Sequence, residues 1–142
     1  MKAKKLLTLL FSIFISFNSF GELTEIGYTD AGNTFYIDNN TIKEHGGYVY
    51  WWDLSDYLIP TKSGHLSIKM YKQGDCGVNR FKNLSFIFYR QPMGEGENVT
   101  DALSKPEWVY PPPGSIASDL LNYACNPSIA QSDLPPTLRL SR

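Results

Sequence analysis

Hydrophobic and polar residues alternate along the middle of the chain, with the two-residue period of a half-buried β-strand. The clearest case is residues 66–71, where Leu, Ile and Met alternate with Ser, Lys and Tyr. Aromatic and β-branched residues predict two further strands, at 48–54 and 78–89, and the glycine pairs at 46–47 and 74–77 mark turns. Because short turns join successive strands, we expect an antiparallel meander.

The residue pattern at 78–89 predicts which side chains lie on the same face of that strand. Leu84, Phe86 and Phe88 share one face in strict alternation, and Arg80 and Lys82 extend that face toward solvent. Two earlier strands are expected at 34–38 and 26–30. Residues 91–107 lack a period and contain two Gly and two Pro, so they predict a loop, followed by a short extended arm at 108–110.

The hydrophobic period then changes to that of a helix. Ser115 is a plausible N-cap, and Ile116, Leu120, Leu121 and Ala124 recur at helical spacing as far as Cys125. We therefore predict an α+β fold, in which one C-terminal helix packs on the antiparallel β-sheet.

The N-terminus predicts export. Three Lys precede a twelve-residue apolar stretch, and Ser19-Phe20-Gly21 has the small residues of a cleavage site, so residues 1–21 are interpreted as a signal peptide. An uncleaved anchor helix is the alternative, but the stretch is shorter than the about 20 apolar residues that span a bilayer. Glu22, rather than a lipid-bearing Cys, would begin the mature chain, for which we expect no membrane span.

Length and charge limit the function further. The chain has 142 residues, enough for one domain, which we place at 22–126 with a flexible tail at 127–142. Without residues 1–21 the charge is −4, which argues against a nucleic-acid partner. The protein is expected in the periplasm, on the outer surface or in the medium.

The two cysteines, Cys76 and Cys125, predict a disulfide, because an exported chain meets an oxidising environment and has no third thiol to compete. The bond would staple the helix end to a strand turn. A pair of free thiols is the alternative interpretation.

No motif names a reaction. His45 and His65 both stand beside glycines in turn-like contexts, far from any nucleophile signature. Asp53 and Asp56 fall on opposite strand faces, and we interpret them as solvated strand-end charges. We therefore predict no catalytic residue, no metal ligands and no cofactor.

Aromatic density is the unusual feature: 12 of the 16 aromatic residues in 22–142 lie between Tyr48 and Tyr110. Either both sheet faces belong to the core, or one face is an exposed patch that binds a partner or a second copy of the chain. The candidate binding residues for the second interpretation are Trp51, Lys69, Tyr71 and Arg90.

A set of short motifs over about residues 36–126 is distinctive in its order. They are Tyr36-Ile37-Asp38, residues 49–57, Ser67-Ile68-Lys69, Asp75-Cys76, Arg80, Leu84-Ser85, Tyr89, Gly94, Gly96, Trp108, Pro113-Gly114-Ser115-Ile116 and Cys125. In this order the chain resembles the surface-adhesin protein E family. The most specific elements are the Asp-Cys turn and the Pro-Gly-Ser helix entry.

The resemblance implies an exported, non-catalytic binding protein that adheres to host extracellular-matrix or cell-surface proteins, such as vitronectin and laminin. It leaves a homodimer open. A small periplasmic enzyme or enzyme inhibitor is the alternative function, because a fold alone carries many functions.

Overall fold

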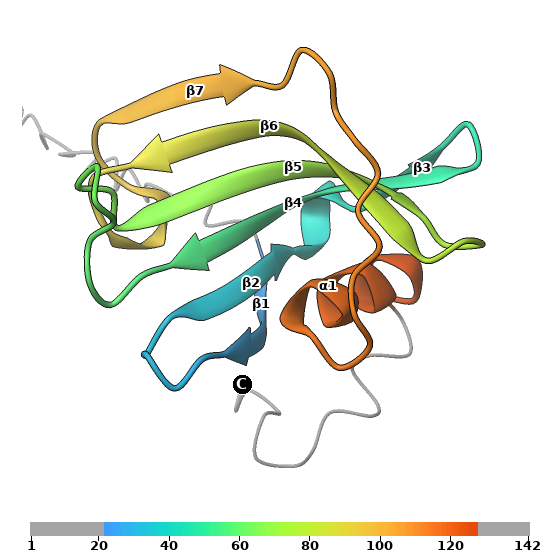
Figure 1. Cartoon of the computed structure of the whole chain (residues 1–142), viewed down its shortest axis with the longest axis horizontal. Helices are drawn as coiled ribbons and strands as arrows, with labels where there is room; N and C mark the ends of the chain where they lie inside the picture. Colours follow the sequence, from blue (N-terminus) through green and yellow to red (C-terminus); the bar gives the residue numbers. More distant parts are fainter. Residues whose placement is uncertain (1–21, 128–142) are drawn as a thin grey trace, which may run out of the picture.

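The computed structural model describes residues 22–127, which form seven β-strands and one α-helix (Figure 1). The predicted signal peptide and most of the predicted tail, residues 128–142, lie outside the described residues. The elements are β1 (Leu23–Tyr28), β2 (Thr34–Asp38), η1 (Asn39–Thr41), β3 (Lys43–His45), β4 (Tyr48–Asp56), β5 (Ser67–Asp75), β6 (Arg80–Tyr89), η2 (Pro92–Gly94), β7 (Asn98–Ala102) and α1 (Ile116–Cys125).

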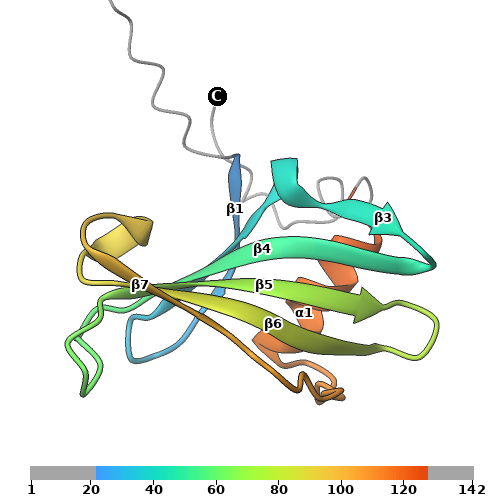
Figure 2. The same cartoon turned by 90° about the horizontal axis from the view of Figure 1, so that it is seen from above.

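All strand pairs are antiparallel, and the sheet order is β1-β2-β4-β5-β6-β7. The turn η1 separates β2 from β3, and both pair with the same edge of β4. Helix α1 lies against one face of this twisted sheet (Figure 2). The predicted fold class is confirmed. No helix within residues 22–127 is long and apolar enough to cross a membrane.

The helix begins as the sequence predicts, since the Ser115 hydroxyl accepts the backbone N–H of Ser118 at 3.1 Å. Its apolar stripe forms the core with alternate residues of the sheet. The buried cluster consists of Ile37, Val49, Trp51, Phe81, Leu120, Leu121, Tyr123 and Ala124. Gly74 permits this close approach, because a Cβ there would lie 2.8 Å from both Leu121 Cδ1 and Trp51 Cζ3.

An ion pair is buried beside this core. Lys72 Nζ lies 2.7 Å from Asp53 Oδ2, and both side chains are almost fully removed from solvent. The interpretation of Asp53 as a solvated charge is therefore wrong. The strand pattern could not reveal it, because the partner Lys72 comes from the neighbouring strand β5, opposite Trp51.

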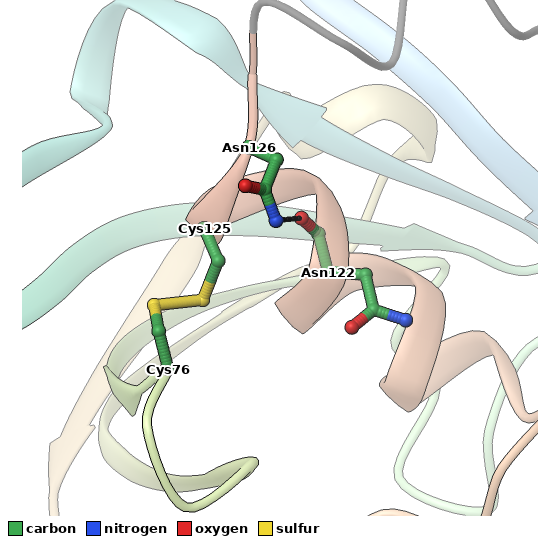
Figure 3. The surroundings of a disulfide bond; sticks show 4 residues. All are labelled: Cys76, Asn122, Cys125 and Asn126. Atoms are coloured by element: carbon green, nitrogen blue, oxygen red, sulfur yellow. Dashed lines mark hydrogen bonds between the residues drawn. A yellow bond between two sulfur atoms is a disulfide. The ribbon is translucent and has the colours of Figure 1, made fainter.

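The predicted disulfide is confirmed (Figure 3). Cys76 lies in the turn between β5 and β6, and Cys125 is the last residue of α1, with a Cα–Cα distance of 5.9 Å. The bond ties the helix end to the sheet, and Asn126 closes the helix beside it by donating its side-chain N–H to the Asn122 carbonyl.

The prediction of a loop over 91–107 is wrong in part. Residues 98–102 form β7, which pairs with β6 along the outer edge of the sheet. All five residues of β7 are exposed. The strand therefore has no buried face and no alternating pattern from which it could be predicted. The three-residue β3 is likewise wholly exposed and was not predicted.

A β-bulge overturns the predicted division of faces on β6. Tyr71 pairs with Ser85 whereas Lys72 pairs with Asn83, so Leu84 is an extra residue. The bulge reverses the alternation beyond it. Lys82 therefore shares a face with Ser85, whereas Phe86 and Phe88 lie on the opposite face.

Candidate functional site

The sheet surface that points away from α1 is rich in aromatic and basic side chains. Trp51 is in the core beneath α1, so its neighbours on β4 point to the other side. The register extends this surface to alternate residues of β5 and β6. We call it the open face. It includes the partly exposed Tyr48, Tyr50, Trp52, Lys69, Tyr71 and Lys82.

Three of these rings form a continuous platform. Trp52 pairs with Tyr71 across β4 and β5, and their rings stack with centroids 5.0 Å apart and planes inclined by 25°. Tyr50 adds a third ring, 6.1 Å from Tyr71. Cross-strand aromatic pairs stabilise a sheet, but these three rings remain partly accessible to solvent and belong to no buried cluster.

A second aromatic group stands beside the platform, where Trp108 packs 5.8 Å from Tyr48. Two cations make cation–π contacts with the Trp108 ring: the Arg80 guanidinium lies 4.2 Å and Lys82 Nζ 4.4 Å from the ring centroid. Val109 fixes this arm by exchanging backbone hydrogen bonds with Phe81. The predicted extended segment at 108–110 is thus present as a single β-bridge.

Lys69 is held at the opposite end of the platform by the turn η2. Its Nζ lies 5.5 Å from the centroid of the Tyr89 ring, and burial raises the pKa of the Tyr89 phenol, so that the ring stays neutral. The backbone of Gly94 packs closely against the Lys69 side chain, since a Cβ at Gly94 would lie 2.7 Å from Lys69 Cε. The Ser67 hydroxyl, which accepts the Gly94 N–H at 2.8 Å, secures this contact.

A hollow of about 210 Å³ opens next to Lys69 and the platform. Trp52, Leu54 and Ile87 form its apolar part, and Lys69 and Asp38 bring opposite charges to it. The strand β1 and the turn η1 contribute Leu23 and Thr41 to its wall.

The structure brings together two of the four predicted binding residues. Lys69 and Tyr71 both lie on the open face, two residues apart on β5. Trp51 has no exposed surface and packs in the core, so its proposed role as a surface anchor is wrong. Arg90 is exposed but faces the other side of the sheet, near Gly64 and beside Phe88 and Glu97.

Sequence reasoning missed the rest of the surface. It placed Lys82 with Phe86 because the bulge at Leu84 leaves no sign in the hydrophobic pattern. It also did not bring Trp108 to the sheet, a contact that requires the long-range bridge to Phe81. Strand alternation does separate Trp51 from Tyr50 and Trp52, but it does not show which of the two faces the helix covers.

The histidines and cysteines of the described residues do not gather at one place. Residues 22–127 contain no group of three or more His, Cys, Asp or Glu arranged to hold a metal ion. His45 lies exposed on β3, and His65 packs 5.2 Å from the Phe88 ring. Both cysteines are in the disulfide.

The fold and the open face define a small α+β domain in which one disulfide-tethered helix backs an aromatic and basic sheet surface. A family model described as surface-adhesin protein E matches residues 23–126. The chain belongs to this family of surface adhesins, as its motifs predict. No curated protein matches the chain by sequence.

Solved structures of Haemophilus influenzae protein E share the fold. One matches with a TM-score of 0.56 at 16% sequence identity, covering 72% of this chain and 83% of that one. Its selenomethionine form gives 0.55 at 18% identity, covering 71% and 84%. A second crystal form gives 0.53 at 18% identity, covering 64% and 79%.

Proposed function

We propose that this chain is an exported, non-catalytic adhesin that binds a host extracellular-matrix or cell-surface protein through its open face. Membership of the surface-adhesin family supports the class of function. We choose the open face as the binding surface because of the platform formed by Tyr50, Trp52 and Tyr71. These three side chains point away from the core and are partly exposed. Aromatic side chains of this kind dominate the binding energy of many protein interfaces.

The charges on the open face fit a binding role. Lys69 and Lys82 take part in no ion pair among the described residues, whereas Arg80 is paired with Asp75 at 3.0 Å. Unpaired cations at the rim of an interface guide the approach of an acidic partner. They also give an otherwise acidic chain a local positive surface.

The test is binding of the purified exported protein to immobilised vitronectin and laminin, which the family resemblance suggests as ligands. Tyr71→Ala should weaken binding by about 1 to 4 kcal/mol, the range of interface hot spots. Val99→Ala is the control, since Val99 is 65% exposed on β7 and pairs with Phe88, on the opposite side of the sheet from the open face. Equal loss in both variants, or no binding at micromolar concentration by the folded protein, contradicts the proposal.

Two controls separate the alternatives. Surface labelling of intact cells distinguishes an adhesin on the outer surface from a periplasmic enzyme or inhibitor. Sedimentation of the wild type and of Tyr71→Ala shows whether the open face instead joins two copies of the chain.

A further inference from the structure

Three lysines surround the aromatic platform of the open face. Two of them stand at the ends of one row across β3, β4, β5 and β6, which consists of Lys43, Tyr50, Gln73 and Lys82. Because neighbouring strands lie about 4.8 Å apart, the backbones of these two lysines are about 14 Å apart. The third, Lys69, lies four residues from Gln73 on β5, or about 13 Å along the sheet.

The open face leaves these lysines without anionic partners. None of the three forms an ion pair among the described residues. On the same side of β2, β4 and β5, the carboxylates are already engaged. Asp75 is paired with Arg80, and Asp38 and Asp56 each accept a backbone N–H. A ligand that brings carboxylates to this surface therefore meets three available cations.

The platform presents ring edges between these cations. The rings of Trp52 and Tyr71 face each other, with 5.0 Å between their centroids and 25° between their planes. Stacked rings expose their edges, which carry the positive part of the aromatic quadrupole. Ring edges and lysines therefore favour the same chemical group, a carboxylate. The faces within the stack are not available to a nucleobase, which would require them.

The hollow beside Lys69 adds an apolar subsite. Trp52, Leu54 and Ile87 line it, and its volume of about 210 Å³ leaves room for one side chain. Asp38 at its wall disfavours an acidic side chain, so the hollow selects an apolar one.

A polypeptide can supply this combination of groups. In an extended chain, residues four apart lie on one side and about 13 Å from each other, close to the spacing of the lysines, and the residue midway between them lies on the same side. The phosphates of a nucleic acid follow one another about every 3.4 Å along a strand and leave no apolar group between them.

We propose that the open face binds an extended segment of its partner protein that is rich in Asp and Glu and has an apolar residue between the acidic ones. The carboxylates meet Lys43, Lys69 and Lys82, and the apolar side chain enters the hollow. This partner chemistry rests on the proposed function, because it specifies which part of the host protein the open face recognises.

Calorimetric titration of the exported protein with the capped peptide Glu-Ser-Leu-Ser-Glu-Ser-Glu tests the proposal. We expect saturable binding that weakens with added salt. Lys43→Gln, Lys69→Gln and Lys82→Gln should each weaken binding about threefold, and the triple variant about tenfold or more. These three residues lie outside the core, so the variants should fold. The control is Lys62→Gln, in the loop between β4 and β5, which is exposed and should bind like the wild type.

Two further peptides test the two kinds of contact. A peptide with Lys in place of each Glu should not bind, and one with Ser in place of Leu should bind more weakly than the first. Equally tight binding of either peptide overturns the proposal, because the lysines or the hollow would then play no part. No binding of the first peptide at millimolar concentration, an equal loss in Lys62→Gln, or equally tight binding of single-stranded poly-dT overturns it as well.

Failure of this proposal is distinguishable from failure of the proposed function. The three lysine variants are also tested against immobilised matrix protein. If the wild type binds that protein, Tyr71→Ala does not, and the triple lysine variant binds as tightly as the wild type, the open face is adhesive but does not recognise an acidic segment.

Discussion

Lys72 and Asp53 form an ion pair beneath α1, with 2.7 Å between Lys72 Nζ and Asp53 Oδ2. The indole N–H of Trp51 donates to the same oxygen at 3.1 Å, and the Phe81 ring lies 5.0 Å from the ammonium group. Asp53 Oδ1 has no hydrogen-bond partner within the described residues. Two charges are therefore held in the core at a desolvation cost that their attraction only partly offsets.

Breaking this pair from one side should destabilise the fold strongly. Lys72→Met leaves the Asp53 carboxylate buried without a cation, and we expect a loss of about 3 to 5 kcal/mol in the free energy of unfolding. Replacing both residues by apolar ones of similar volume should recover most of that loss. Urea unfolding of the single and double variants measures both effects. A single variant within about 1 kcal/mol of the wild type would show that the pair is not buried as described.

The pair also predicts a pH dependence. Burial raises the pKa of Asp53 above its usual range, and the nearby Lys72 only partly opposes this shift. An acid with a raised folded-state pKa contributes stability that is complete below its unfolded pKa of about 3.9 and is lost as the pH rises through the folded value. The stability of the wild type relative to Asp53→Asn should therefore fall as the pH increases from acid to neutral. A flat or rising difference contradicts the assignment.

Trp51 and Trp52 are adjacent in the sequence but should respond differently to the same substitution. Trp51 is fully buried against α1, so Trp51→Ala should cost about 3 to 5 kcal/mol of folding stability. Trp52 lies in the open face and should cost less stability but reduce ligand binding. Thermal unfolding and binding assays on both variants provide the comparison. Similar losses of stability would mean that the sheet has two buried faces.

The disulfide should contribute substantially to the stability of this small domain. Cys125→Ser opens a link across 49 residues and is expected to cost about 2 to 5 kcal/mol. Reduction of the wild type should lower its melting temperature toward that of the variant. Alkylation of both thiols in the native, unreduced protein would contradict the bond.

The sequence was sufficient for the elements that have one buried face. Ile68 and Met70 lie on the same side of β5 as the buried Lys72, and the helix stripe ending at Cys125 has a clear period. The exposed strands β3 and β7 have no such constraint, and pairing with their neighbours supplies what their side chains do not. Hydrogen bonding of this kind is not visible in a hydrophobic pattern.

The candidate site was predicted only in part, because it depends on register and on long-range contacts. Lys69 and Tyr71 follow from strand alternation, but the bulge at Leu84 decides that Lys82 joins them. Trp51 and Trp52 look equivalent in a strand with aromatic residues on both faces. Only the position of α1 shows that Trp51 belongs to the core.

Photo-cross-linking on intact cells tests most directly the claim that the open face is the adhesive surface. A photoreactive aromatic amino acid in place of Tyr71, and separately in place of Val99, is placed in the exported protein before the cells are exposed to host matrix. We predict a cross-linked matrix product from position 71 and none from position 99, which pairs with Phe88 on the opposite side of the sheet. Equal cross-linking at both positions, or products from position 99 alone, would contradict the claim.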